Sequence, residues 1–256
     1  MRESKILLKA GKACKIGRKI LHTITNMLLL LLLLFSIYAL YDNWNIFRGT
    51  AVGDDMLVFK PQIDTAQEVV NPSINDLIDK YPDARAWITI DETKIDYPVV
   101  QGEDNLEYVN TNIDGEFSLS GAIFLDYKNT KDFSDLYNIL HGHFMDLGVM
   151  FSDLKLFASQ DFLNKNSTGT LYLPNKTVEL EIFAYLSASA YDPIFYSPNQ
   201  NNIETQEQKL SEIKKRASAY REIDLSSDDQ IIALSTCDFY GTDSRILVFA
   251  KMLKNN

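Results

Sequence analysis

The stretch QIIALSTCDFYGTDSRILVFAKM, Gln230–Met252, contains two apolar runs separated by a polar loop. The runs Ile231–Leu234 and Ile246–Ala250 are as short and as apolar as buried strands, so the stretch predicts a strand, a loop and a strand. Cys237 stands at the end of the first run and Arg245 at the start of the second. A thiol and a guanidinium at facing ends of neighbouring strands can converge on one carbonyl group, the thiol attacking its carbon and the guanidinium meeting the developing oxyanion.

Charge is distributed unevenly along the 256-residue chain. The first nineteen residues hold seven of the 25 Lys and Arg and one of the 35 acidic residues, which leaves 18 basic and 34 acidic residues for the remainder. An acidic body argues against a nucleic-acid partner, because phosphates require a basic face. The length and the 46% apolar content fit one well-packed domain with additions.

The basic head is followed by the run Met27–Leu40, which is apolar except for Ser36, within a wider apolar stretch at about 20–41. This pattern predicts a membrane helix whose positive flank stays in the cytoplasm. We therefore expect four parts, with the last one outside the cell: a cytoplasmic head (1–19), a transmembrane anchor (20–41), a juxtamembrane linker (42–70) and a catalytic domain (71–256).

A cleaved signal peptide is the competing interpretation of the apolar run. It requires small residues at the cleavage site, and the sequence IYALYDNW places Ile37 at one of those positions. An uncleaved anchor is therefore favoured.

The predicted topology places Cys14 inside the cell and Cys237 outside, so the two cysteines cannot pair. An unpaired cysteine outside the cell is a buried inert residue, an intermolecular bridge or a free reactive thiol. The residue alone does not choose among them.

Short β-rich runs separated by turn residues begin at Ala86 and predict about eight strands, in an antiparallel barrel or sandwich. The predicted strands are Trp87–Ile90, Tyr97–Gln101, Gly121–Leu125, Asn138–His143, Gly169–Leu173, Thr177–Ala190, Ile231–Ser235 and Ile246–Leu253. Helices are expected at Ser73–Lys80, Phe151–Phe162 and Glu204–Glu222, the last with an apolar stripe at helical spacing.

A nucleophilic thiol needs a base, and the chain has three histidines. His22 belongs to the predicted anchor, which leaves His141 and His143, two residues apart at the end of a strand. Each could instead be a locally hydrogen-bonded histidine, and Arg245 could be a salt-bridging strand residue. Spacing does not decide between the two histidines.

Several ordered motifs resemble the sortases, membrane-anchored cysteine transpeptidases of Gram-positive surfaces. These are LSTC at the end of a strand, an Arg eight residues later, and a Gly-His followed by Met-Phe. The resemblance is to class B in WITIDETKIDYPVVQGEDN (Trp87–Asn105), GAIFLDY (Gly121–Tyr127), HGHFMDLGVMFSDL (His141–Leu154) and the helix at 204–222, and it extends from about Ile74 to Leu253.

The resemblance implies a mainly β fold, a closed eight-stranded sortase-type β-barrel with flanking helices. These include an N-terminal helical segment and a long helix before the strand that carries the cysteine. It implies Cys237 as nucleophile, His143 as acid and base, and Arg245 as the cation that stabilises the oxyanion or orients the substrate. His141 stands where the class often has Tyr, and Ala233 where Thr is commoner. Asn105 and Ser235 fall at substrate-contacting positions, with turn-forming and strand-packing roles as the alternatives.

The implied function is cleavage of the C-terminal sorting signal of surface proteins through a thioacyl intermediate, with transfer to an amine of the cell wall. No cofactor and no metal are implied. The loops at 192–203 and the helix after them are expected to read the sorting motif. A membrane-anchored cysteine peptidase, a pilin-polymerising sortase and a non-catalytic binding module remain alternatives.

Overall fold

The computed structural model describes residues 2–50, 54–61, 72–145, 148–198, 202–237 and 243–253. Its contacts divide the chain into two compact units, Met1–Arg48 and Gly49–Asn256. The helices are α1 (Arg2–Thr50), α2 (Asp54–Leu57), α3 (Pro72–Lys80), the 3₁₀ helix η2 (Ser152–Ala158), α4 (Gln160–Lys165) and α5 (Ile203–Arg216). The strands are β1 (Ala84–Ile90), β2 (Asp96–Val100), β3 (Ile123–Leu125), β4 (Tyr137–His141), β5 (Thr168–Leu173), β6 (Lys176–Ser189), β7 (Ala219–Tyr220), β8 (Ile231–Cys237) and β9 (Ser244–Met252).

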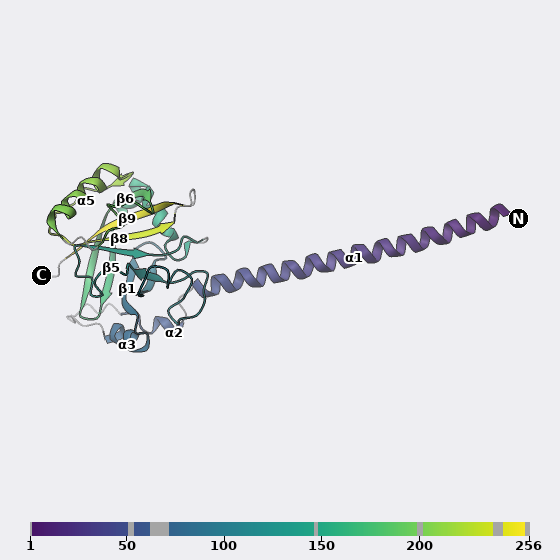
Figure 1. The fold of residues 1–256 in the computed structure, drawn as a ribbon, viewed down its shortest axis with the longest axis horizontal. Coiled ribbons are helices and arrows are strands. Elements are labelled where there is room, and N and C mark those ends of the chain that lie inside the picture. The colour runs from purple at the N-terminus through teal and green to yellow at the C-terminus, as the bar shows by residue number, and fades with distance from the viewer. Residues whose placement is uncertain are drawn as a thin grey trace. The chain divides into compact units, whose positions relative to one another are not determined.

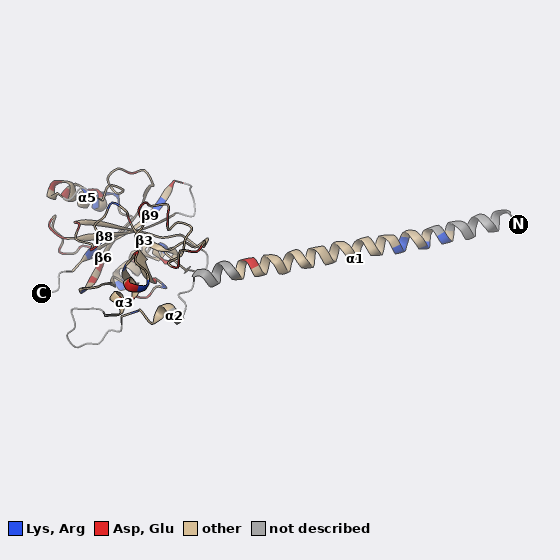
Figure 2. Ribbon diagram, turned by 60° about the horizontal axis from the view of Figure 1, so that its bottom comes forward, with Lys and Arg blue, Asp and Glu red and all other residues tan. Residues whose placement is uncertain are grey.

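The first unit is dominated by α1, in which Cys14–Trp44 is long and apolar enough to cross a membrane. Among the side chains described, basic residues lie on the N-terminal side of the uncharged stretch and an acidic residue lies beyond it (Figure 2). An apolar surface of this length is compatible with a membrane anchor.

The second unit is a closed β-barrel (Figure 1). The strands follow the order β5-β1-β2-β3-β4-β8-β9-β6, and the pairing of β5 with β6 closes the ring at eight strands, with β7 added beside β6. Closure leaves no free edge among those eight strands. The predicted eight-stranded barrel is confirmed, and all eight predicted strands are present.

Two of the pairings differ from the antiparallel arrangement that the strand spacing suggested. Strands β2 and β3 are parallel, and so are β4 and β8. Parallel neighbours require long crossover connections, and nearly ninety residues, including η2, α4, β5, β6 and α5, separate β4 from β8. No local sequence pattern specifies such a pairing.

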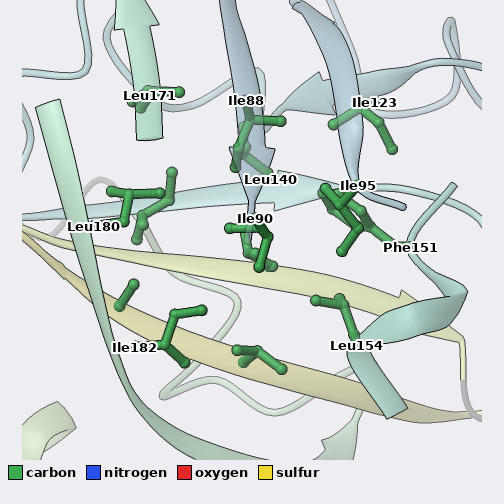
Figure 3. Packing of buried hydrophobic residues seen from close by; sticks show 14 of the residues in the cluster. Ile88, Ile90, Ile95, Ile123, Leu140, Phe151, Leu154, Leu171, Leu180 and Ile182 are labelled. Carbon is green, nitrogen blue, oxygen red and sulfur yellow. The ribbon is translucent and has the colours of Figure 1, made fainter. Parts of the chain in front are cut away.

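Alternation along the strands sorts their side chains into an interior core and an outer layer. Ile232 and Leu234 of β8 belong to the interior cluster, which gathers residues of the other strands and of η2. Figure 3 shows part of this cluster, with Leu154 of η2 beside the strands. Ile231 and Ala233 point outward and pack with Ile213 of α5 in a second cluster. Residues of odd number on β8 therefore share the outer face.

Two of the predicted helices have different bounds. The stretch expected as one helix at 151–162 consists of η2 followed by α4, with Ser159 between them accepting a hydrogen bond from the Phe162 N–H at 3.4 Å. The helix expected at 204–222 ends at Arg216, because the chain turns extended at Ala217 and pairs with β6 as the short strand β7.

The segment 54–61 lies within the expected linker and packs on the barrel. Met56 is buried in a cluster with Ile74, Leu77 and Trp87. Lys60 Nζ lies 2.5 Å from Asp96 Oδ2, and Asp96 Oδ1 accepts a hydrogen bond from the Trp87 indole at 2.7 Å. The folded unit thus includes residues that precede the predicted catalytic domain.

Candidate active site

Cys237 and Arg245 are direct partners across the β8–β9 ladder. Side chains alternate between the two faces of a strand, and this alternation places Cys237 and Arg245 on the outer face of the barrel, the face that also carries Ile231 and Ala233. Directly opposed residues have Cβ atoms about 4.5–5.5 Å apart. Cys237 is a free, half-buried thiol, and the half-buried Arg245 donates from Nη1 to the Ser244 carbonyl at 3.1 Å. The structure therefore brings together the two residues that the opening stretch singled out.

His143 reaches the same end of the barrel from β4. The parallel ladder pairs His141 with Ser235, and the Gly142 N–H continues it by donating to the Ser235 carbonyl at 3.1 Å. His143 and Cys237 are each two residues beyond that last pair. Neighbouring strands lie about 4.8 Å apart, so the register places His143 and Cys237 at corresponding positions of the backbone at this end of the barrel.

The imidazole of His143 has a fixed hydrogen-bond partner. Its Nε2 lies 2.7 Å from the Val109 carbonyl oxygen, and a carbonyl only accepts, so Nε2 carries a proton. The other ring nitrogen, Nδ1, remains as the one that can accept or release a proton. Val109 belongs to the long β2–β3 connection, which the sequence did not connect with the histidine.

Gly142 allows the backbone after β4 to lie close against side chains of the interior core. A Cβ atom there would collide with Ile123 Cδ1 and lie 2.8 Å from Phe151 Cδ2. The Phe151 N–H also donates to the His143 carbonyl at 3.1 Å. A residue without a side chain is thus needed next to the histidine.

Ser235 and Asn105, the two predicted substrate-contacting residues, lie at different depths. Ser235 is 2% exposed, and its hydroxyl lies 2.9 Å from the Tyr196 hydroxyl. Asn105 is half-buried and donates from Nδ2 to Asp126 Oδ2 at 2.7 Å, while its Oδ1 accepts from the Tyr127 N–H at 3.0 Å. Each has a structural partner, and their contact with substrate stays a prediction.

His141 links these two residues. Its Nε2 lies 3.0 Å from the same Asp126 oxygen that Asn105 contacts, and its ring stacks with Tyr196 at 6.3 Å between centroids and 17° between planes. Burial alone would raise the pKa of Asp126. The hydrogen bond and the charge of His141, with the donors Asn105 and Lys128, outweigh burial and hold that pKa below its usual value.

Tyr196 is the site residue that sequence reasoning missed. Burial raises its pKa to about 12; the Ser235 hydrogen bond and the charge of Arg245 oppose the rise, and a charge on Cys237 adds to it. The phenol therefore stands within electrostatic reach of both Cys237 and Arg245. The sequence offered only a tyrosine between two prolines in the 192–203 stretch.

Hydrogen bonds hold the backbone on both sides of Tyr196. The Tyr137 hydroxyl donates to the Phe195 carbonyl at 2.9 Å, and Lys209 of α5 donates to the Ser197 carbonyl at 3.2 Å. Lys209 is 2% exposed, and burial lowers the pKa of its ammonium group. The hydroxyl of Tyr196 is thus held in place by backbone contacts of its neighbours.

The predicted loop between Cys237 and Arg245 lies partly outside the described residues, since 238–242 are not among them. Within the described part of the chain, no group of three or more His, Cys, Asp or Glu residues could hold a metal ion.

Comparisons with known proteins point to one family. No protein-family model matches the chain. Sortase B of Listeria monocytogenes is 36% identical over 171 residues, which cover 66% of this chain and 68% of the relative. Sortase B of Staphylococcus aureus is 30% identical over 192 residues, which cover 73% of this chain and 78% of the relative.

Solved structures show the same likeness. A Streptococcus pyogenes class B sortase involved in pilus biogenesis has a TM-score of 0.65 at 38% identity, covering 70% of this chain and 97% of that one. A Staphylococcus aureus sortase B–substrate complex has a TM-score of 0.71 at 26% identity, covering 86% and 100%. A sortase B complexed with triglycine has a TM-score of 0.65 at 27% identity, covering 72% and 87%. From these relatives and from its barrel, the chain belongs to the class B sortases, a family of cysteine transpeptidases.

Proposed function

We propose that this protein cleaves the C-terminal sorting signal of surface proteins, holds the released acyl group as a thioester on Cys237, and transfers it to an amine of the cell wall. The observation that carries the proposal is the pairing of Cys237 with Arg245 at the end of β8 and β9, with His143 at the corresponding position beyond β4. A nucleophile, a cation and a proton carrier then share one end of the barrel.

The first half of the reaction forms the thioester. The Cys237 thiolate attacks the scissile carbonyl carbon, and the oxyanion that forms lies against the Arg245 guanidinium. The His143 imidazolium gives its Nδ1 proton to the leaving amine as the carbon–nitrogen bond breaks. The hydrogen bond from Nε2 to the Val109 carbonyl supports this assignment, because it leaves Nδ1 for proton transfer.

The second half regenerates the enzyme. An acceptor amine attacks the thioester carbonyl, and His143 takes a proton from that amine. Collapse of the tetrahedral intermediate forms the new amide and expels Cys237 as thiolate. The enzyme thus returns to the thiolate–imidazolium pair from which it started.

Asn105 and Ser235 are proposed to contact the sorting signal, and Tyr196 joins them. The position of Ser235 supports this role, because it lies two residues before Cys237 on β8 and therefore on the same face of the strand. Tyr196 contacts Ser235 and lies within electrostatic reach of Cys237 and Arg245.

The N-terminal helix is proposed to anchor the enzyme in the cell membrane, with the N-terminus in the cytoplasm and the barrel outside. The basic residues before the apolar stretch support this orientation. A tethered enzyme meets membrane-held substrates at a high effective concentration.

The acceptor has two candidates. A structural neighbour was solved in complex with triglycine, which favours a peptide amine of the wall. A neighbour involved in pilus biogenesis is 38% identical to this chain, which supports a pilin amine as the second candidate.

The test incubates the full chain in detergent with peptides that span the sorting signals of surface proteins from the same organism. Triglycine and a lysine-containing pilin peptide are the two acceptors, and products are identified by mass spectrometry. Ligated product that disappears in Cys237→Ala supports the proposal, and the preferred acceptor separates wall anchoring from pilin assembly. Hydrolysis that neither amine alters would identify a peptidase.

A further inference from the structure

We infer that His141 is a positioning residue for the proposed substrate contact of Asn105: through Asp126 it fixes the orientation of the Asn105 amide. The inference rests on the proposed function, since it gives Asn105 a contact with the sorting signal. His141 lies on the strand that leads to His143, but a separate set of contacts engages it.

The first step is the shared oxygen. Asp126 Oδ2 accepts from His141 Nε2 at 3.0 Å and from Asn105 Nδ2 at 2.7 Å, while Oδ1 accepts from the Lys128 N–H at 3.0 Å. The side chain of Asp126 is 5% exposed and that of His141 18% exposed. A buried carboxylate is destabilised when it loses one of its hydrogen-bond donors, and it rotates to find a replacement. Rotation of Asp126 would move the oxygen that holds Asn105, so the geometry of Asn105 depends on the donor from His141.

The second step concerns the amide itself. With Nδ2 held by Asp126 and Oδ1 held by the Tyr127 N–H at 3.0 Å, the Asn105 side chain cannot flip its two ends. A fixed amide presents one defined pattern of donor and acceptor to a peptide backbone. Without Asp126 in its present place, that pattern would be lost.

The third step is the ring. The His141 imidazole stacks with Phe124, at 5.1 Å and 30°, and with Tyr196, at 6.3 Å and 17°. These contacts keep Nε2 aimed at Asp126, because a stacked ring cannot rotate freely.

Two substitutions separate the hydrogen bond from the ring. His141→Phe keeps the stacked ring and removes the donor, whereas His141→Gln removes the ring and keeps an N–H near the position of Nε2. We expect His141→Phe to raise KM for the best peptide of the panel about tenfold, with kcat changed by less than about twofold. His141→Gln should restore KM to within about threefold of the wild-type value. The rate at which iodoacetamide alkylates Cys237 should be the same in all three proteins.

A double-mutant cycle tests the route through Asn105. Asn105→Ala should raise KM by itself, and adding His141→Phe should raise it little further, since both changes remove one interaction. The inference would be overturned if the KM increase of the double variant equalled the product of the two single increases. It would also be overturned if His141→Phe had the wild-type KM. If His141→Phe does not fold, the comparison of His141→Asn with His141→Gln makes the test, because both variants lack the ring and only the longer Gln amide reaches Asp126. A wild-type protein without any ligation would instead refute the proposed function, so the two failures are distinguishable.

Discussion

Arg245 offers the sharpest test of the catalytic arrangement. Replacing it by Ala removes the cation that stands directly across the ladder from Cys237. Loss of one oxyanion-stabilising group costs about 2.7–4 kcal/mol, so kcat/KM for ligation should fall about 10²–10³-fold. The fall should appear mainly in kcat if the guanidinium acts on the transition state.

A matched control uses a second arginine of the barrel. Arg221 pairs with Glu181 at 2.9 Å, and Glu181 lies opposite Lys251, near the other end of β9 from Arg245. Arg221→Ala removes the same charge, and we expect kcat/KM to stay within about twofold of wild type, as for surface ion pairs. Arg245→Lys keeps the charge without the planar fork and should fall between wild type and Arg245→Ala.

The assay measures ligation of the best peptide to triglycine by the full chain, over a range of peptide concentrations. Thermal unfolding of each variant verifies that it is folded. An Arg245→Ala enzyme with kcat/KM close to wild type would refute the role given to the guanidinium. A loss confined to KM would reassign Arg245 to substrate binding.

Three further predictions concern the framework of the site. Met56→Ala should lower the free energy of unfolding by about 2–3 kcal/mol in urea titrations, because the side chain is 6% exposed in a packed cluster; an unchanged midpoint would show that the segment does not pack there. The raised pKa of Tyr196 means that the folded chain keeps a proton that the unfolded chain loses above about pH 10. The free energy of unfolding of the wild type should therefore fall between about pH 10 and 12 more steeply than that of Tyr196→Phe, by up to about 1 kcal/mol per pH unit. Parallel pH curves for the two proteins would count against the raised pKa. Gly142→Ala should cost about 1–3 kcal/mol of stability, since the new methyl group would meet Phe151, and should lower kcat; a fully active, fully stable variant would contradict the close approach.

The strands of the barrel could be predicted well because they carry strong local signals, whereas the closed barrel followed from the family resemblance. The apolar runs around Ile232 and Val248 mark strands without reference to any partner, and turn residues between them mark their ends. Closure and pairing depend on contacts between residues far apart in the chain. The parallel β4–β8 ladder, which places His143 and Cys237 at corresponding backbone positions, is therefore visible only in the structure.

The site was predictable in part for the same reason. Cys237 and Arg245 flank one loop, so their proximity follows from a simple strand–loop–strand pattern. The choice of His143 over His141 came from the family resemblance, and it stays a prediction. Tyr196 and Asp126 could not be found from spacing, because each reaches the site from a different connection of the barrel.

The central claim is that Cys237 carries the acyl group between donor and acceptor. The most direct measurement is mass spectrometry of the protein after brief mixing with the best peptide and no amine, followed by digestion and mapping. The account predicts an acyl adduct on the fragment that contains Cys237, absent in Cys237→Ala and discharged by triglycine with formation of the ligated product. Ligated product formed without any adduct, or an adduct on another residue, would contradict it.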